Sequence, residues 1–363
     1  MSLGSEFLTP INTKTAGFQF LSDNASSADG SSVAVWVDTF SPTDHDIRAQ
    51  RFNAFGAKVG PDFVVSSSSL DEATPKVAMN ANGDFVVTWM QTLTSGDTNV
   101  VARKFNALGI AQGNVVQVGV GTFKEHNPDV AMDDFGRFVV AYVRDTNNNN
   151  PDVFAKRYDT NGNLLNVVNV ATSTRAELNP TIAMTSDGRF NVAWEEAFSA
   201  TDHDIKMNRY SASAQFVSSV SIATSSLTES LPSLSMDRFG NSVVAYEKVG
   251  NGGHDIKARR VNFAGIAGLE TGIASSFADE RAPSVALKRN GGGFVVSYQS
   301  MSLLPTHVKV AEVSALNQVL ATHDAGPRFD AAVSINGLDD YLLTYTSFES
   351  GDLNIRGRRG HLS

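Results

Sequence analysis

Two stretches of the sequence share the string Thr-Asp-His-Asp-Ile, and these residue types could perform metal or acid–base chemistry. The first copy contains Asp44 and His45, and the second contains Asp202 and His203. Carboxylate and imidazole groups bind metal ions and transfer protons near neutral pH. Calcium, however, needs several oxygen ligands from one tight loop. These four residues are therefore candidates for binding a ligand, and the alternative is a local structural role.

The last Asp of the string belongs to a position that recurs along the chain, just before the first apolar residue of an expected strand. This position is Asp or Asn in six of seven cases: Asp46, Asn99, Asp152, Asp204, Asp255, His307 and Asn354. Such side chains often stabilise turns by accepting hydrogen bonds from nearby backbone N–H groups. Turn chemistry and a shallow calcium or sugar contact both stay open for this position.

A second acidic series lies three residues before a proline that we expect to open a strand. Its members are the candidate metal ligands Glu72, Glu125, Glu177, Glu229 and Glu280. They could form a partial carboxylate ring for calcium or a polyol, or each could tie neighbouring loops together by accepting backbone hydrogen bonds. Calcium is the one cofactor that the sequence leaves open, and otherwise we expect none.

A few residues on the same expected loops break the repetition and are therefore better candidates for a specific site. They are His126, Arg281, Arg328 and Asp330, which we assign to ligand binding. Glu195 and Glu196 are adjacent on an expected strand and point to opposite sides, so we do not expect them to act as a pair. The sequence contains no nucleophile-elbow, zinc-protease, Walker or dinucleotide fingerprint, and we assign no catalytic residue.

The elements that position these residues follow from an internal repeat. One aromatic register contains all three tryptophans of the chain and recurs at Trp36, Trp89, Tyr142, Trp194, Tyr246, Tyr298 and Tyr345. The second repeat shows four expected strands at 75–80, 84–91, 99–106 and 114–120. Period-2 alternation and Asn-Gly or Asp-Gly turns are typical of strands joined by tight turns. Seven such repeats account for the whole chain.

Seven repeats of four antiparallel strands predict an all-β, seven-bladed β-propeller as a single domain over residues 1–363. The predicted blades are 17–67, 75–120, 128–172, 180–224, 232–275, 283–324, and 331–360 completed by 7–13. The last repeat lacks a fourth strand, and the strand at 7–13 would supply it and close the ring. The two Thr-Asp-His-Asp-Ile strings are three blades apart, roughly 150° around this ring, so we do not expect them to share one metal ion.

The repeat pattern, as in "DGRFNVAWEE" and "DIKARRVNFAG", resembles repeats of large secreted and surface proteins of bacteria, including adhesin-type proteins. This resemblance implies a propeller and an extracellular, cell-surface or periplasmic location, although no signal peptide is visible. The net charge of −9 argues against nucleic-acid binding. No segment is long and apolar enough to be inserted in a membrane as a helix, and the absence of cysteine excludes disulfides.

These observations predict a non-catalytic binding or scaffold propeller that engages a protein or a glycan through its loop face, as a monomer. The alternative is a carbohydrate-active enzyme, a lyase or glycosidase, with a site at the channel mouth. A multivalent lectin is the third hypothesis, because lectins repeat their sites. The strong internal symmetry favours the binding hypothesis, since catalytic sites usually break symmetry.

Overall fold

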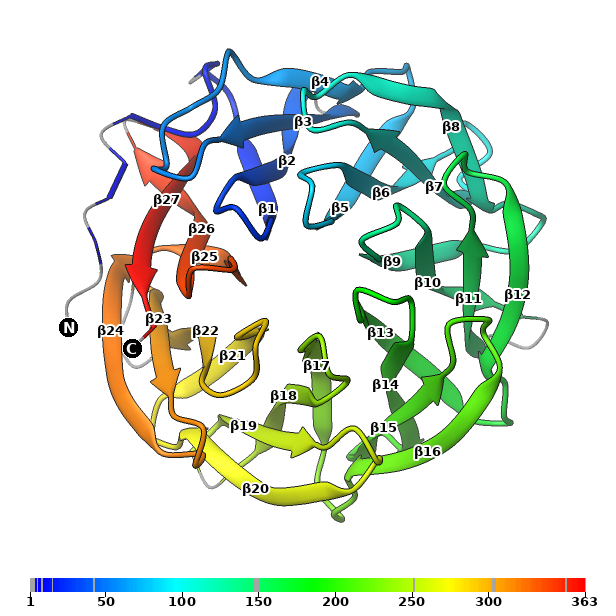
Figure 1. Ribbon diagram of the computed structural model, residues 1–363, viewed down its shortest axis with the longest axis vertical. Coiled ribbons are helices and arrows are strands. Elements are labelled where there is room, and N and C mark those ends of the chain that lie inside the picture. The colour runs from blue at the N-terminus through cyan, green and yellow to red at the C-terminus, as the bar shows by residue number, and fades with distance from the viewer. Residues whose placement is uncertain are drawn as a thin grey trace.

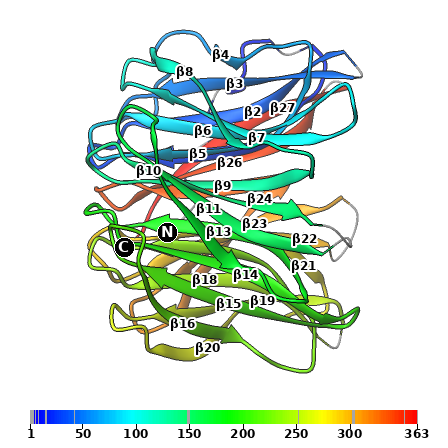
Figure 2. The ribbon, with the colours of Figure 1, turned by 90° about the vertical axis from the view of Figure 1, so that its right-hand side faces the viewer.

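The structure, a computed structural model, describes residues 4, 6–7, 9–14, 16–41, 43–146, 150–250, 252–301, 305–349 and 351–362. Within these residues, 27 strands form seven antiparallel sheets around a central axis (Figure 1). The side view shows the strands of neighbouring blades stacked around the ring (Figure 2). Six sheets have four strands and one has three. The predicted all-β, seven-bladed propeller is confirmed.

The strands of each blade pair in chain order from the axis to the rim (Figure 1). Blade 1 consists of β1 (Gln19–Ser26), β2 (Ser32–Ser41), β3 (Asp44–Phe52) and β4 (Phe63–Ser66), and blade 2 of β5 (Asp71–Met79), β6 (Phe85–Thr92), β7 (Thr98–Phe105) and β8 (Ala111–Gly119). Blade 3 consists of β9 (Glu125–Met132), β10 (Phe138–Asp145), β11 (Pro151–Tyr158) and β12 (Leu164–Ala171), and blade 4 of β13 (Ala176–Met184), β14 (Phe190–Ser199), β15 (Asp202–Tyr210) and β16 (Phe216–Ala223). Blade 5 consists of β17 (Glu229–Met236), β18 (Ser242–Val249), β19 (His254–Val261) and β20 (Ala267–Ala274), and blade 6 of β21 (Asp279–Leu287), β22 (Phe294–Met301), β23 (His307–Val313) and β24 (Val319–Pro327). Blade 7 consists of β25 (Phe329–Ile335), β26 (Asp340–Glu349) and β27 (Asp352–His361).

The hydrophobic core lies between blades. One cluster joins Val35 and Ile47 of blade 1 to Val87 and Trp89 of blade 2, and similar clusters join other neighbouring blades. The aromatic residue of each second strand is buried in this layer, which explains the single register of the three tryptophans. Burial of a large aromatic side chain in every blade stabilises the repeat.

In blades 2 to 6 the first strand begins earlier than the sequence indicated, because the strand continues through its proline. β5 begins at Asp71 rather than at Pro75, and its pairing with β6 shifts between Ala73 and Lys76. Pairings of the first two strands show the same bulge in the other six blades. A bulge leaves one residue unpaired, so a proline without an N–H group fits there.

Basic side chains late in the third strands of five blades connect the blade to the next one. Arg51 donates a hydrogen bond to the Ala107 carbonyl at 2.7 Å, and Arg209 and Arg359 reach the carbonyls of Phe263 and Ala54 in the same way. Their acceptors lie in the turn between the third and fourth strands of the following blade. Main-chain carbonyls, rather than carboxylates, are therefore the principal partners of this basic series.

The N-terminal segment closes the ring beside β27, but it is not a regular strand (Figure 1). Glu6 forms an isolated antiparallel bridge with Arg358. The N–H groups of Phe7 and Ile11 donate to the carbonyls of Gly357 and Ile355 at 3.0 and 2.7 Å. The expected strand at 7–13 is thus replaced by an irregular segment, because Pro10 has no N–H group to continue a ladder.

No helix among the described residues has the length and apolar character needed to cross a membrane.

Candidate functional site

A cavity of about 490 Å³ lies on the propeller axis, where the first strands of the blades converge. Its wall contains five prolines that follow the bulges: Pro75, Pro128, Pro180, Pro232 and Pro283. Small-molecule sites commonly have volumes of about 300–1,000 Å³. The axial cavity is therefore large enough for a ligand the size of a small sugar.

Seven residues in the left-handed backbone conformation surround this cavity, one in each blade. Their φ angles lie between 47° and 51°: Leu21, Thr74, Asn127, Asn179, Leu231, Ala282 and Asp330. Residues other than glycine rarely adopt this conformation, which asparagine and aspartate tolerate best. Its occurrence in all seven bulges shows that the fold imposes the conformation and accepts its cost at the apolar positions.

A second ring is formed by the residues two positions after the left-handed ones, and most of its side chains connect neighbouring blades inside the cavity. Its members are Asp23, Lys76, Asp129, Thr181, Ser233, Ser284 and Ala332. Asp23 Oδ2 accepts a hydrogen bond from Val77 N at 2.9 Å, and Asp129 Oδ2 accepts one from Ile182 N at 2.9 Å. Hydroxyl groups accept the corresponding bonds in the following blades: Thr181 from Leu234 N, Ser233 from Val285 N and Ser284 from Val333 N. Most of this ring is therefore structural.

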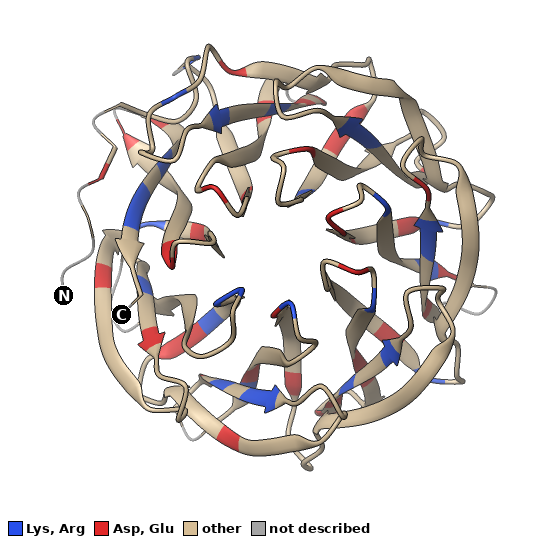
Figure 3. Ribbon diagram, in the orientation of Figure 1, with Lys and Arg blue, Asp and Glu red and all other residues tan. Residues whose placement is uncertain are grey.

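Lys76 departs from this second ring, because its ammonium group can only donate hydrogen bonds. It lies between the blades that carry Asp23 and Asp129. The Asp23 carboxylate, assisted by Asp129, raises the pKa of Lys76, and burial raises the pKa of Asp129. Lys76 is therefore a charged donor in the cavity wall at neutral pH. The inner strands carry both signs of charge around the opening (Figure 3).

Amide and carboxyl groups add polar character to the cavity wall. Asn127 Nδ2 donates to Asn179 Oδ1 at 3.1 Å, and Asn179 Nδ2 donates to Glu195 Oε2 at 2.9 Å. Gln299 also lines the cavity. Asp330 accepts a hydrogen bond from the Leu21 backbone, and burial raises its pKa. The wall thus presents donors and acceptors in several directions, which suits a polyhydroxylated ligand.

The structure brings one of the four symmetry-breaking candidates, Asp330, into the axial cavity. The other three lie outside its described lining. His126 Nε2 lies 3.2 Å from Asp145 Oδ1. Arg281 pairs with Asp279 at 2.9 Å and with Glu247 at 3.3 Å.

Arg328 packs against the ring closure rather than into the cavity. It lies 3.5 Å from Glu6, and its guanidinium lies 5.5 Å from the ring centre of Tyr345.

The histidines of the two repeated strings face different acids on separate blades. His45 Nδ1 lies 2.5 Å from Asp71 Oδ1 of blade 2, whereas His203 Nδ1 lies 2.6 Å from Glu195 Oε1 of its own blade. Asp44 has a buried oxygen without a partner among the described residues, and Asp202 is half-buried. The two strings thus make different contacts, one across a blade interface and one within a blade.

Two of the recurring acids of the third strand, Asp46 and Asp152, lie near glutamates of the next blade. Burial is the main cause of the raised pKa of Asp46, about 6, and the charge of Glu72 contributes to it. Burial is also the main cause of the raised pKa of Glu177, about 7, and the neighbouring Asp152 adds to it. At these two blade interfaces, the two acidic series that the sequence shows separately are therefore neighbours.

The five glutamates are buried, with exposed fractions of 0–2%. Four accept hydrogen bonds from the serine hydroxyl four residues earlier: Glu72 from Ser68, Glu177 from Ser173, Glu229 from Ser225 and Glu280 from Ser276. Glu125 pairs with Arg144 at 3.0 Å instead. Within the described part of the chain, no three acidic or histidine side chains are placed to hold one metal ion.

A second cavity, of about 340 Å³, lies at the interface of blades 3 and 4, away from the axis. Glu177 and Glu196 line it together with Trp194, Lys206 and Asn208. Glu195 and Glu196 point to opposite sides of β14, as expected. Glu195 accepts a hydrogen bond from Asn179 of the axial cavity, whereas Glu196 lines the second cavity. The partner of Glu196 is Glu177, directly opposite on β13.

The sequence analysis missed Asp23, Lys76 and Asp129 as cavity residues, and it missed the cross-strand pair Glu177 and Glu196. The repeat register contains a signal for the first set, because all three occupy one position beside the bulge. The pair of Glu177 and Glu196 could be found by pairing the first two strands of each repeat antiparallel, provided that the position of the bulge is known.

Solved structures share this fold at low sequence identity. A protein of unknown function from Dyadobacter fermentans has a TM-score of 0.58 at 9% identity, with 98% of each chain covered. A polysaccharide lyase, an ulvan lyase of family PL25, has a TM-score of 0.57 at 9% identity, with 98% of this chain and 94% of that chain covered. A leech intramolecular trans-sialidase has a TM-score of 0.54 at 8% identity, with 100% of this chain and 71% of that chain covered.

No protein-family model and no curated protein sequence matches this chain. At identities below 10%, the solved structures show a common propeller fold and do not define a site in this protein.

Proposed function

We propose that this propeller binds a neutral saccharide in the axial cavity. The observation that carries the proposal is the cavity wall itself, in which an ammonium, amides, hydroxyls and carboxyls converge on a volume of about 490 Å³. Sugar hydroxyls both donate and accept hydrogen bonds, so a mixed wall of this kind suits them better than a wall of one type. Leu21 and Leu231 add apolar surface for the faces of a sugar ring.

The charge balance of the cavity favours a neutral sugar over an acidic one. Lys76 is its single cationic side chain among the described lining residues, against Asp23, Asp129 and Asp330. Arginine, whose two parallel N–H groups match a carboxylate, does not occur in that described lining. A uronic or sialic acid would bring a further negative charge to this wall, which we expect to weaken its binding.

Carbohydrate-directed activity is also supported by the neighbours of the fold, which include a trans-sialidase and a polysaccharide lyase. They support the carbohydrate-active alternative better than a protein scaffold. A carbohydrate-active enzyme is therefore our second candidate, and Lys76 and Asp129 are the observation that favours it. A permanently charged donor beside a carboxyl group of raised pKa is an arrangement suited to acid–base chemistry.

A glycan array followed by calorimetry on the best neutral glycan tests the proposal. Lys76→Thr gives blade 2 the residue that blade 4 has at this position, Thr181, and we expect affinity to fall about tenfold or more. Asn161→Ala, in an exposed turn, is the matched control and should bind like the unchanged protein. An array without neutral glycan hits, or equal affinity of the Lys76→Thr variant, would refute the proposal.

Prolonged incubation of the same glycan with the protein separates binding from catalysis. New reducing ends or unsaturated products would identify an enzyme, and loss of these products in Asp129→Asn would assign the acid–base role. An unchanged glycan would leave saccharide binding as the function.

We further propose that the protein works as a monomer outside the cytoplasm, in keeping with the resemblance of its repeats to those of bacterial secreted and surface proteins. Cell fractionation and sedimentation of the purified protein test these two points.

A further inference from the structure

The second cavity, between blades 3 and 4, can be understood by comparing blade 4 with the other blades. The cavity lies between the end of β12 in blade 3 and the sheet of blade 4, and its volume is about 340 Å³. It is separate from the axial cavity, because the two have no lining residue in common.

A short side chain lies at the position where blades 2, 3, 5 and 7 place a long basic one. Arg103 and Lys156 span the interface and donate to the carbonyls of Val65 and Val118 in the preceding blade, at 3.0 and 2.6 Å. Asn208 occupies the same register in blade 4 and reaches the Val170 carbonyl at 2.9 Å. The cavity lies beside this shorter side chain, where the stem of an arginine or lysine would otherwise pack.

The neighbouring row of charges also differs from that of blades 3 and 5. Three residues lie directly opposite one another across the first three strands of each blade. The middle residue is a cation between two acids in blade 3 (Glu125, Arg144, Asp152) and in blade 5 (Glu229, Lys248, Asp255). In blade 4 the row is Glu177, Glu196 and Asp204. The cation is replaced by a third acid, and like charges directly opposite each other are destabilising.

The described groups around this row compensate its charge only in part. Arg175, before β13, lies 3.3 Å from Glu196. Lys206 of β15 lies 2.7 Å from Asp204 and 4.0 Å from Glu196. With Asp152 of β11 included, four carboxyl groups face three cations, because Arg144 of β10 lies opposite Asp152.

Glu177 is a buried acid of this row with a raised pKa. It is 1% exposed, and no described N–H or O–H group donates to its Oε2 atom. Burial, with the adjacent Asp152, raises its pKa to about 7. When Glu177 carries its proton, the row has one negative charge fewer. In blades 3 and 5, Arg144 and Lys248 reduce the negative charge of the row in a similar way.

We propose that this cavity binds an amino sugar, whose primary ammonium group occupies the place that Arg144 and Lys248 fill in the sister blades. The ammonium would lie between Glu177 and Glu196. Trp194 supplies an aromatic edge for the sugar ring: it is 7% exposed, whereas Trp36 and Trp89 are fully buried. Its indole nitrogen has no described acceptor, and Ser219 and Ser221 add hydroxyl groups to the wall.

Binding of the ammonium would release the proton of Glu177 to solvent. The carboxylic acid of Glu177 becomes a carboxylate, and the ammonium of the ligand takes over its neutralising role. Affinity should therefore rise as the pH approaches the pKa of Glu177, about 7, and fall again at higher pH, where the amine of the ligand loses its proton. The charged groups that face this exchange are Arg144, Asp152, Arg175, Glu196, Asp204 and Lys206.

Calorimetry with glucosamine oligomers tests the proposal, and N-acetylglucosamine oligomers of equal length are the uncharged counterpart. We expect binding of the amine form alone, with proton release detected from the dependence of the heat on the ionisation enthalpy of the buffer. Equal binding of both oligomers, or the absence of binding by the amine form, would overturn the proposal.

Variants that copy the sister blades locate the site. Glu196→Lys supplies the cation of blade 5, and Asn208→Arg fills the cavity as in blades 2 and 5, so both should weaken binding about tenfold or more. Ser300→Lys places the same cation at the same register of blade 6 and should leave binding unchanged. If Glu196→Lys does not fold, Asn208→Arg decides, and full binding by a folded Asn208→Arg protein would place the ligand elsewhere. Lys76→Thr in the axial cavity should have no effect.

Discussion

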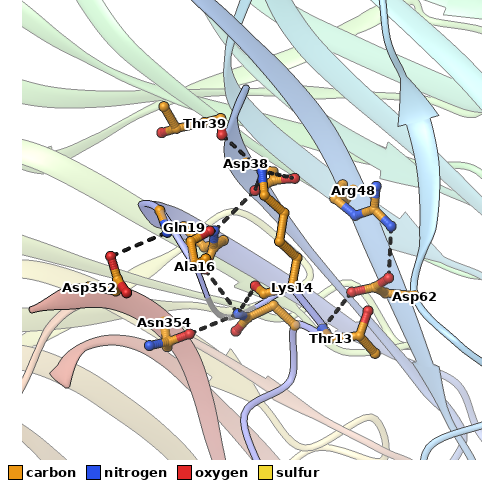
Figure 4. Close-up of polar contacts among 12 residues, drawn as sticks. Thr13, Lys14, Ala16, Gln19, Asp38, Thr39, Arg48, Asp62, Asp352 and Asn354 are labelled. Carbon is orange, nitrogen blue, oxygen red and sulfur yellow. Dashed lines mark hydrogen bonds and ion pairs between the residues drawn. The ribbon is translucent and has the colours of Figure 1, made fainter. Parts of the chain in front are cut away.

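The closure of the ring depends on a single buried side chain, Asn12, which is 2% exposed. Its Nδ2 group donates to the Lys14 carbonyl at 2.7 Å, Gln19 Oε1 at 3.0 Å and Asn354 Oδ1 at 2.9 Å. Its Oδ1 atom accepts a hydrogen bond from Ile355 N at 2.8 Å. Asn12 thereby connects the N-terminal segment, blade 1 and β27 of blade 7, in the region that Figure 4 shows.

The change Asn12→Ala should destabilise the protein by about 3–9 kcal/mol. It removes all four contacts and leaves three buried groups, the Ile355 N–H, the Asn354 Oδ1 and the Gln19 Oε1, without their Asn12 partner. Each such group costs about 1–3 kcal/mol. The unfolding entropy expected for 363 residues is about 0.8 kcal/mol/K, so the melting temperature should fall by about 4–12 °C.

Calorimetric and urea unfolding of the variant measure this effect. Asn161→Ala, which removes an asparagine side chain from an exposed turn, should change stability by less than about 0.5 kcal/mol. A melting temperature of Asn12→Ala equal to that of the control would refute the argument that this side chain holds the ring closed.

Three further predictions concern pH, backbone strain and metal. The pKa of Glu177 is raised from 4.5 to about 7, so the folded state holds this proton more tightly than the unfolded state does, and stability should fall as the pH rises from about 4.5 to about 7. In urea unfolding, Glu177→Gln should make this decline smaller by up to about 3 kcal/mol. An unchanged pH profile of the variant would contradict the assignment. Leu231 has a φ of 47°, so Leu231→Gly should raise the free energy of unfolding by about 0.5–1 kcal/mol, whereas a decrease would show that its side-chain contacts outweigh the strain. Melts with calcium and with a chelator should have equal midpoints, because no described group of three acids or histidines can hold a metal ion; a higher midpoint with calcium would reveal a site.

The number of blades and the antiparallel strands within them could be predicted because they depend on local properties. Alternation of apolar residues, turn dipeptides and one aromatic register repeat along the chain and need no knowledge of distant contacts. The start of each first strand could not be predicted in this way. Pro75 opens the predicted strand, whereas the observed β5 begins before it and continues through it by means of a bulge. Bulges at the same position precede Asp23, Lys76 and Asp129 in blades 1, 2 and 3, and all three residues line the axial cavity.

The sequence by itself determined the propeller, its seven blades and the residues that recur in each, because the same short-range pattern specifies every blade. The tertiary structure alone decided which of those residues meet. Glu177 and Glu196 face each other through strand pairing, and Asp152 joins them from another blade. Strand register and the packing of blade on blade set such contacts, and a local sequence pattern carries no direct record of either. The departures of blade 4 from its sisters therefore become a candidate binding site only when the strands are placed side by side.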